Sequence, residues 1–406
     1  MPDLKEGQGE ASLETSFGGF VNPRLTASVF NQSNERFALS LLNLFLKDQK
    51  VSSELFNNFP GIDRRQNALL ESESLTVYED YAHHPHEIKL LIDAFISKYG
   101  KGELVVVFQP HRFSRTKALI REFSEVLKTA NSVFLLPVYS AYEAHCEGGS
   151  SEDLIKLFKG AKINALSMDL DGLNQLKKHT NSLQNPVFLF VGAGSITEFA
   201  QAFCAYYENG STQSAWLSFI QSRVSNDCQL KLSENMASKT TFKIGGDALY
   251  YAEPGSTSDV LALLESARLF SLDYFCLGRG SNVLIADSGY NGLLMRFNQK
   301  IWREIKLVDD LHIWVGCGTR LKELCGFVAQ LGFSGFEFLE GIPGTLGGAL
   351  RMNAGAMGWE IFDLVEWVSF LLPDGSIREI PGSELDVGYR NCRDAEDGIA
   401  LRAKLR

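Results

Sequence analysis

Residues Gly341–Ala356 read GIPGTLGGALRMNAGA, and this stretch decides how the second half of the chain is interpreted. It holds five glycines and one asparagine in sixteen residues, beside one proline and one arginine. Glycine allows positive φ and close approach of the backbone to a ligand, and successive exposed amide N–H groups form concave anion sites. A second glycine-rich stretch, Gly278–Asn282, lies upstream. Either stretch alone could be a simple turn. Together they indicate two backbone loops that hold one long diphosphate cofactor.

Length and composition place the chain among ordinary globular proteins. It has 406 residues, which at about 150 residues per domain predicts two or three domains. It is 45% hydrophobic and 22% charged, with a net charge of −10. The acidic balance argues against nonspecific binding to nucleic acid.

Cysteine usage and hydropathy indicate where the protein resides. The seven cysteines form no C-x-x-C pair, which favours reduced thiols over disulfides or a zinc site. Residues 1–19 lack the apolar core of a signal peptide, and no apolar run reaches the ~18 residues of a spanning helix. We therefore expect a soluble cytoplasmic protein with no membrane span.

Periodicity divides the chain into two halves. Strands predicted at 75–78, 104–108, 133–136 and 187–191 alternate with helical patterns, including one that begins at Pro85, which is typical of a covered parallel sheet. This rhythm is lost near residue 206, and short strands with many glycines follow. The predicted class is α/β, a Rossmann-like parallel sheet followed by an α+β domain. The predicted domains are a poorly defined segment 1–31, a domain 32–205, a linker 206–230 and a domain 231–406.

Histidines and arginines gather after two of the predicted strands. His83 follows one strand end, and His111, Arg112 and Arg115 follow the strand at 104–108. Ligands bind beyond the C-terminal ends of parallel strands, and arginines there commonly clamp carboxylate or phosphate. A metal site is the competing interpretation, but no cysteine lies close enough to complete a zinc pattern. An ordinary surface cluster is the third interpretation, and we expect no metal.

Four motifs in the first half resemble the C-terminal domain of the UDP-N-acetylmuramate–L-alanine ligases, which belong to the Mur ligase family. They occur in the family's order as FPGIDRR (59–65), DYAHHP (80–85), FQPHRFSRT (108–116) and VYSAYE (138–143). The resemblance covers about residues 32–205, with Glu79 where the family usually has a second Asp. It implies that His83, His111, Arg112 and Arg115 help to hold L-alanine and the acyl-phosphate intermediate.

The ATP-binding part of such a ligase is missing from the sequence. No G-x-x-x-x-G-K-[ST] loop occurs, and the 31 residues before the match cannot contain two further domains. ATP and Mg²⁺ would be used only in a complete ligase, and we do not expect this chain to ligate by itself.

The glycine-rich loops of the second half resemble the UDP-N-acetylenolpyruvoylglucosamine reductases, flavoenzymes with the FAD-binding fold of vanillyl-alcohol-oxidase-type proteins. The match from about residue 231 rests on KTTFKIGG (239–246), GRGSN (278–282), the 341–356 stretch and GYRN (388–391). The resemblance implies that NADPH reduces FAD and that a hydride then reaches the enolpyruvyl double bond of a UDP-sugar. Donors aimed at the developing enolate charge would be the largest protein contribution.

The resemblance also implies residue roles. Tyr389 and Arg390 match the family's Tyr-Arg pair, in which the arginine stabilises the enolate and the substrate carboxylate. Arg351 is a further candidate for a phosphate contact. The residues implied in FAD binding are Thr240, Thr241, Gly245, Gly278, Gly280, Ser281, Asn282, Gly344, Thr345, Gly347, Gly348, Asn353, Ala354 and Gly355.

Both resemblances are partial, and this leaves alternatives open. In the reductase family, the proton-donating serine or cysteine lies in a substrate-binding region that follows the Tyr-Arg segment, and the given sequence stops at Arg406 before that residue is reached. We therefore name no proton donor, and Cys392 does not match the family's position for it. The main hypothesis is a fusion of two enzymes of peptidoglycan precursor synthesis, acting on UDP-sugars. The alternatives are a non-catalytic remnant that binds FAD or UDP-sugar and an unrelated flavin oxidase. The sequence does not indicate the oligomeric state.

Overall fold

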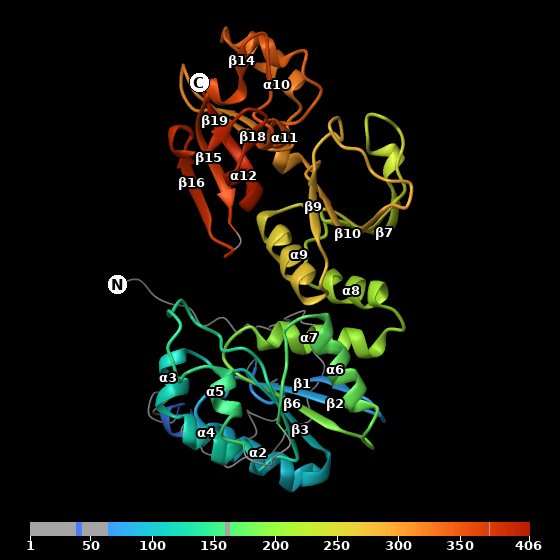
Figure 1. The fold of residues 1–406 in the computed structure, drawn as a ribbon, viewed down its shortest axis with the longest axis vertical. Coiled ribbons are helices and arrows are strands. Elements are labelled where there is room, and N and C mark those ends of the chain that lie inside the picture. The colour runs from blue at the N-terminus through green and yellow to red at the C-terminus, as the bar shows by residue number, and fades with distance from the viewer. Residues whose placement is uncertain (1–37, 43–63, 159–162, 373) are drawn as a thin grey trace, which may run out of the picture. The chain divides into compact units, whose positions relative to one another are not determined.

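A six-stranded, mainly parallel sheet organises the first half of the chain (Figure 1). The structure is a computed structural model that describes residues 38–42, 64–158, 163–372 and 374–406. The antiparallel edge strand β1 pairs with β2, and the remaining neighbours pair in parallel. In spatial order the strands are β1 (Asn67–Glu71), β2 (Thr76–Asp80), β6 (Val187–Val191), β3 (Leu104–Phe108), β4 (Ser132–Leu135) and β5 (Ile163–Ala165).

Both faces of this sheet are covered. Alternate residues of β3 and β6 pack with Phe95 and Phe123 from helices on one face. Phe190 points to the other face, where its ring meets Phe199. The helices of this half are α2 (Pro85–Tyr99), α3 (Phe113–Ala118), α4 (Ile120–Leu127), α5 (Ser151–Ile155), α6 (Leu170–Thr180) and α7 (Ile196–Glu208).

Helix α2 begins where the sequence predicts. Pro85 occupies the first turn of α2, and the Glu87 side chain caps the backbone of His84. The four apolar residues at helical spacing, Ile88, Leu91, Ile92 and Phe95, are all buried. The strands at 104–108 and 187–191 are confirmed, and both are buried along their whole length.

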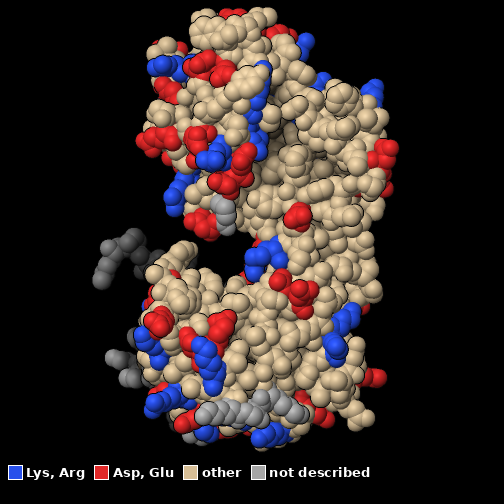
Figure 2. All heavy atoms as spheres, in the orientation of Figure 1, with Lys and Arg blue, Asp and Glu red and all other residues tan. Residues whose placement is uncertain are grey.

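Contacts divide the chain into two compact units. One comprises Met1–Leu166 with Thr180–Ala200, and the other comprises Ser167–His179 with Gln201–Arg406. The boundary therefore passes through α7 and groups most of α6 with the second unit. On the face in Figure 2, acidic and basic side chains are interspersed in each unit.

The second unit begins with a four-stranded sheet. Its order is β7 (Gln229–Asn235), β8 (Asp247–Glu253), β10 (Tyr290–Arg296) and β9 (Tyr274–Leu277), with the last three parallel. Two helices accompany this sheet, α8 (Thr212–Gln221) and α9 (Thr257–Leu269).

A five-stranded antiparallel sheet forms the rest of the second unit. Its order is β11 (Ile305–Leu307), β12 (Ile313–Gly316), β19 (Ile399–Leu405), β15 (Val365–Leu371) and β16 (Ile377–Pro381). Leu324, Leu350 and Phe370 belong to one buried core beside it. The shorter elements around it are α10 (Leu321–Gln330), α11 (Leu346–Arg351), α12 (Asp394–Asp397), β13 (Gly355–Ala356), β14 (Trp359–Glu360), β17 (Val387–Gly388) and β18 (Asn391–Cys392).

The predicted fold class is confirmed: a parallel sheet is followed by an α+β unit. The predicted linker 206–230 contains α8, whose Trp216 is fully buried. The polar residues around Trp216 hid this helix from the sequence pattern. Segment 1–31 lies outside the described residues, as does most of the helical pattern at 37–46, of which residues 38–42 are helical. In the described part of the chain, no helix is long and apolar enough to cross a bilayer.

Candidate functional site

The histidine–arginine cluster of the first unit assembles at the ends of β2, β3 and β4. The His83 and His111 rings lie 6.0 Å apart, and the His111 ring stacks on Tyr139 at 5.4 Å. Arg112 donates its backbone N–H to the Tyr139 carbonyl over 2.8 Å. Tyr139 follows the next strand along the sheet, so these contacts form at one edge, as parallel pairing requires.

The cluster combines positive charge with buried polar atoms that have no hydrogen-bond partner. Burial lowers the pKa of His111, and the neighbouring charges of Arg115, His83 and Arg112 lower it further. Within the described residues, Arg115 Nη1 and His111 Nδ1 are buried and find no hydrogen-bond partner. The buried Arg115 Nη1 is a donor that needs an acceptor, so the arrangement suits an anionic ligand.

Two residues of this cluster were missed by the sequence prediction. Arg64 Nη2 donates to the carbonyls of Gly192 and Gly194, both over 3.1 Å, and its guanidinium lies 4.9 Å from the Tyr81 ring centroid. Asp80 accepts from the backbone of Gln66 and Ala82, while its burial raises its pKa. Arg64 lies in the motif FPGIDRR and Asp80 in the motif DYAHHP, so the motifs themselves could have pointed to both residues.

A metal site is the competing interpretation of this cluster. Among the described residues, no three His, Cys, Asp or Glu side chains are arranged to hold a metal ion.

In the second unit, three loops predicted to hold a cofactor meet one another. Thr241 donates its backbone N–H to the Gly280 carbonyl over 2.9 Å. A Cβ atom placed on Gly280 would lie 2.6 Å from the Lys239 carbonyl oxygen, and one on Gly278 would lie 2.3 Å from Thr345 Oγ1. These loops are far apart in the sequence, and glycine is required where they touch.

Other glycines of these loops face open space. A Cβ atom on Gly344 would have no neighbour closer than 3.9 Å, and one on Gly348 would meet only Thr345 Oγ1, at 3.7 Å. Gly347 and Gly348 belong to the first turn of α11, and Gly348 is exposed. Ser281 lies beside Gly344, and Asn282 is exposed. The loops therefore pack together without closing over these two glycines.

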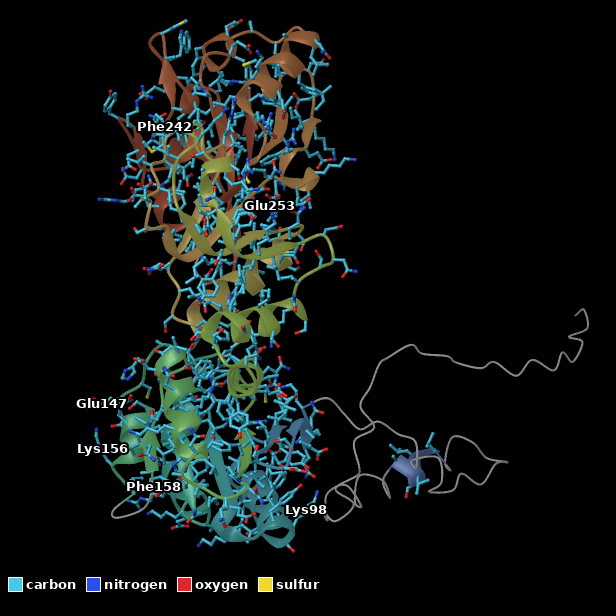
Figure 3. All side chains as sticks on the ribbon, turned by 90° about the vertical axis from the view of Figure 1, so that its right-hand side faces the viewer. Lys98, Glu147, Lys156, Phe158, Phe242 and Glu253 are labelled. Carbon is cyan, nitrogen blue, oxygen red and sulfur yellow. The ribbon has the colours of Figure 1, made fainter. Side chains whose placement is uncertain are left out.

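The remaining loop residues form the frame around this opening. Thr240 is buried and donates its hydroxyl to the Ile244 carbonyl over 3.0 Å, and Gly245 adopts a φ of +123° against Ile285. Ala354 is buried and donates its N–H to the Ala349 carbonyl. Phe242, labelled in Figure 3, is 62% exposed.

The predicted catalytic pair lies at the tip of the β17–β18 hairpin. Tyr389 is 84% exposed, and the Arg390 guanidinium lies 5.5 Å from its ring centroid. Arg390 Nη2 donates to the Gly355 carbonyl over 3.1 Å, which joins the hairpin to the glycine-rich stretch. Arg351 was proposed for a phosphate, but its guanidinium donates to Asn391 Oδ1 and Glu396 Oε1.

Buried polar atoms beside these loops are consistent with a polar ligand. Within the described residues, Asn353 Oδ1 and Thr319 Oγ1 are buried without a hydrogen-bond partner. Together with the open faces of Gly344 and Gly348, they fit a cofactor that approaches the backbone closely.

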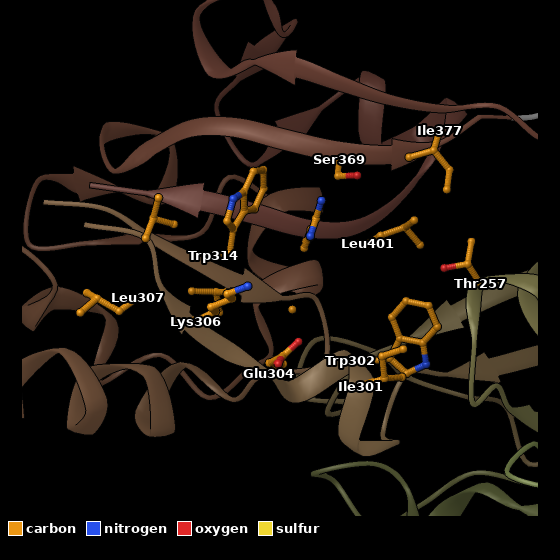
Figure 4. A pocket seen from close by; sticks show the side chains of 14 residues that line it. Thr257, Ile301, Trp302, Glu304, Lys306, Leu307, Trp314, Ser369, Ile377 and Leu401 are labelled. Carbon is orange, nitrogen blue, oxygen red and sulfur yellow. The ribbon is translucent and has the colours of Figure 1, made fainter. Parts of the chain in front are cut away.

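A separate pocket of about 670 Å³ opens on the five-stranded sheet (Figure 4). Trp302, Trp314, Ser369 and Arg402 are among its lining residues. The Arg402 guanidinium lies 4.5 Å from the Trp314 ring centroid, and its Nη2 donates to Glu379 Oε1 over 3.0 Å. None of the predicted site residues, all of which are described, lines this pocket.

Each half of the chain contains a region that matches a known protein family. The family described as Mur ligase, glutamate ligase domain matches residues 64–194, and the family described as FAD binding domain matches residues 248–381. The chain thus joins a part similar to the Mur ligase C-terminal domain to a part similar to an FAD-binding domain, as the sequence motifs predict.

Individual relatives agree with this division. UDP-N-acetylenolpyruvoylglucosamine reductase of Heliobacterium modesticaldum is 36% identical over 170 residues, which cover 42% of this chain and 54% of that protein. The chain spans about half the length of the curated relatives it matches.

Two solved structures are similar to different parts of the chain. UDP-N-acetylenolpyruvylglucosamine reductase from Thermus caldophilus is 31% identical, with a TM-score of 0.37 over 44% of this chain and 61% of that one. UDP-N-acetylmuramate-alanine ligase from Thermotoga maritima is 26% identical, with a TM-score of 0.36 over 45% of this chain and 39% of that one.

Proposed function

We propose that this protein acts in peptidoglycan precursor biosynthesis, as a reductase of UDP-N-acetylenolpyruvoylglucosamine joined to an alanine-binding ligase domain. The product would be UDP-N-acetylmuramate, with NADPH as reductant and FAD as cofactor. The observation that carries the proposal is the meeting of the loops at Thr241, Gly280 and Thr345, where glycine contacts bring three distant motifs together.

The cofactor would lie along the open faces of these loops. Thr240, Thr241 and Gly245 would line the adenine and diphosphate side. Bound FAD would supply hydride transfer between NADPH and the enolpyruvyl double bond. Asn282 and the backbone of 278–281 would hold the diphosphate, and residues 344–355 would lie beneath the flavin.

Arg390 would act on the substrate. A guanidinium at an exposed hairpin tip can reach the substrate carboxylate and stabilise the negative charge that develops beside it. Tyr389 lies next to it and would orient the same end of the substrate.

The first unit would hold L-alanine. Arg112 and Arg115 would bind its carboxylate, because arginine donors match two carboxylate oxygens. His111, whose pKa is lowered, would stay neutral near pH 7 and could accept a proton. ATP and Mg²⁺ would take part only in a complete ligase, and we place the protein in the cytoplasm, where nucleotide sugars are made.

The test is spectroscopic and uses the purified 406-residue chain. We expect flavin absorbance that NADPH bleaches and that UDP-N-acetylenolpyruvoylglucosamine restores under anaerobic conditions. A chain that stays colourless after incubation with FAD would contradict the proposal and support a remnant that no longer binds FAD. Bound flavin that NADPH or the UDP-sugar fails to change would indicate a non-catalytic binding module. Reduction by simple alcohols with no response to the UDP-sugar would identify an oxidase of another kind.

A further inference from the structure

The segment Arg351–Gly355 holds the β17–β18 hairpin at several points. Arg351 contacts Asn391 in β18, Asn353 contacts Gly388 in β17, and the Gly355 carbonyl accepts from Arg390 at the tip. Each strand of this hairpin is only two residues long. A hairpin this short has little stability of its own, so its position depends on these contacts.

Arg351 clamps the hairpin from its β18 side. Its Nη1 donates to Asn391 Oδ1 over 3.0 Å, and its Nη2 donates to Glu396 Oε1 over 2.7 Å. Asn391 directly follows Arg390, and Glu396 lies in α12, the next element of the chain. The planar guanidinium has two donors directed at two acceptors at once, which a lysine ammonium cannot reproduce with the same geometry.

Asn353 holds the hairpin from its β17 side. It is 1% exposed, and its Nδ2 donates to Glu360 Oε2 over 2.6 Å and to the Gly388 carbonyl over 3.1 Å. Its backbone has a φ of +39° just after the end of α11. The two tethers therefore start two residues apart and reach opposite strands.

We propose that Arg351 is a positioning residue that sets where Arg390 stands over the cofactor loops. The inference rests on the proposed function for the role of Arg390, but the tether itself does not. Arg351 acts through Asn391 and Glu396 and has no direct part in the chemistry. This assignment replaces the phosphate contact suggested by its place in the glycine-rich stretch.

The first test measures amide hydrogen exchange in a peptide covering residues 386–393 of the full chain. We expect Arg351→Met to speed exchange there on the order of tenfold, because the hairpin opens more often once it loses hydrogen bonds. Arg303→Met is the matched control: it breaks the Arg303–Glu323 pair, which at 2.9 Å is close in length to the 2.7 Å Arg351–Glu396 pair and has similar exposure but lies elsewhere in the unit. Equal exchange in Arg351→Met and the parent chain would overturn the proposal.

The second test follows the pre-reduced flavin as the enolpyruvyl substrate reoxidises it. Arg351→Met should retain its flavin but slow reoxidation by about 10- to 100-fold, the range for a misplaced group. Arg351→Lys should be slowed less. In an Arg390→Ala background, Arg351→Met should add nothing, because both changes remove the same contribution.

The outcomes separate this proposal from the proposed function. Loss of flavin in Arg351→Met would indicate a direct cofactor contact and would overturn the positioning role. Full additivity with Arg390→Ala would overturn it as well. If the parent chain holds no flavin or shows no transfer, the proposed function fails, while the exchange experiment still decides whether Arg351 tethers the hairpin.

Discussion

Three of the predicted site residues have positive φ although none is glycine. They are Arg112 at +71°, Asn353 at +39° and Arg390 at +56°. Such backbone conformations cost roughly 1–2 kcal/mol for residues with a side chain. They persist where surrounding contacts hold them, and they cluster at functional sites. Arg112 lies just beyond the end of β3, and Arg390 lies at the tip of the β17–β18 hairpin.

Substitutions at the glycines of the cofactor loops distinguish effects on flavin binding from effects on folding stability. Gly348→Val places its side chain in open space, so we expect unchanged unfolding by urea but a flavin content reduced by at least about tenfold. Gly278→Ala would collide with Thr345 and should lower both stability and flavin content. Asn282→Ala should also reduce flavin retention. Full flavin content in Gly348→Val would contradict our placement of that loop.

The pKa of His111 provides a pH-dependent test of the first cluster. Burial and the charges of Arg115, His83 and Arg112 hold this pKa below the unfolded value of about 6.5. The unfolded chain therefore binds the proton more readily, and this residue lowers stability as pH falls through about 6.5. We expect Arg115→Gln to raise the His111 pKa in an NMR titration. Arg121→Gln is the control, since Arg121 is not among the charges that shift it. An unchanged His111 pKa in Arg115→Gln would show that the charge of Arg115 does not act on His111.

Helix α8 lies inside the segment that the loss of periodicity predicts to be a linker. Residues 206–230 are rich in Ser, Asn and Gln, so their apolar pattern is weak. Ser211 nevertheless caps the helix, and Trp216 inserts toward α9. Trp216 Nε1 donates to Ser266 Oγ over 2.9 Å, and its ring meets Tyr250 edge-on at 5.1 Å. One large buried side chain thus fixes the helix in place.

Removing this anchor should destabilise the second unit. We expect Trp216→Ala to lower the free energy of unfolding by about 3–5 kcal/mol, the usual cost of a large aromatic cavity. Ser266→Ala should cost about 1–3 kcal/mol, because it leaves the buried indole N–H unpaired. Urea unfolding followed by circular dichroism measures both. If Trp216→Ala unfolds like the parent chain, α8 is dispensable and the linker prediction stands.

Each unit has its own hydrophobic core. Phe95, Phe108 and Leu189 belong to a core of the first unit, while Leu324, Leu350 and Phe370 belong to one in the second. Separate cores are the physical basis for domains that fold alone. We therefore propose that the two enzyme-like parts unfold as separate domains.

Calorimetry of the full chain tests this separation. We expect two unfolding transitions. Added FAD should raise the transition temperature of the second unit only, because FAD at a hundred times its dissociation constant adds about 2.7 kcal/mol to the free energy of unfolding. Phe108→Ala should lower the transition temperature of the first unit only, and it should leave the flavin content unchanged. A single transition that responds to both changes would contradict two independent domains.

Local sequence patterns were sufficient for the α/β class, for α2, and for the strands at 104–108 and 187–191. The reason is that burial imposes a period on consecutive residues, and a cap or a proline marks the start of a helix. Motif order was also sufficient to suggest which loops hold a cofactor. The sequence could not reveal that Gly278 touches Thr345, that Gly280 touches Lys239, or that Arg351 holds the hairpin of Arg390. Those contacts join segments tens of residues apart, and no local propensity encodes them. They arise only when the two sheets of the second unit bring their loops and hairpins into contact.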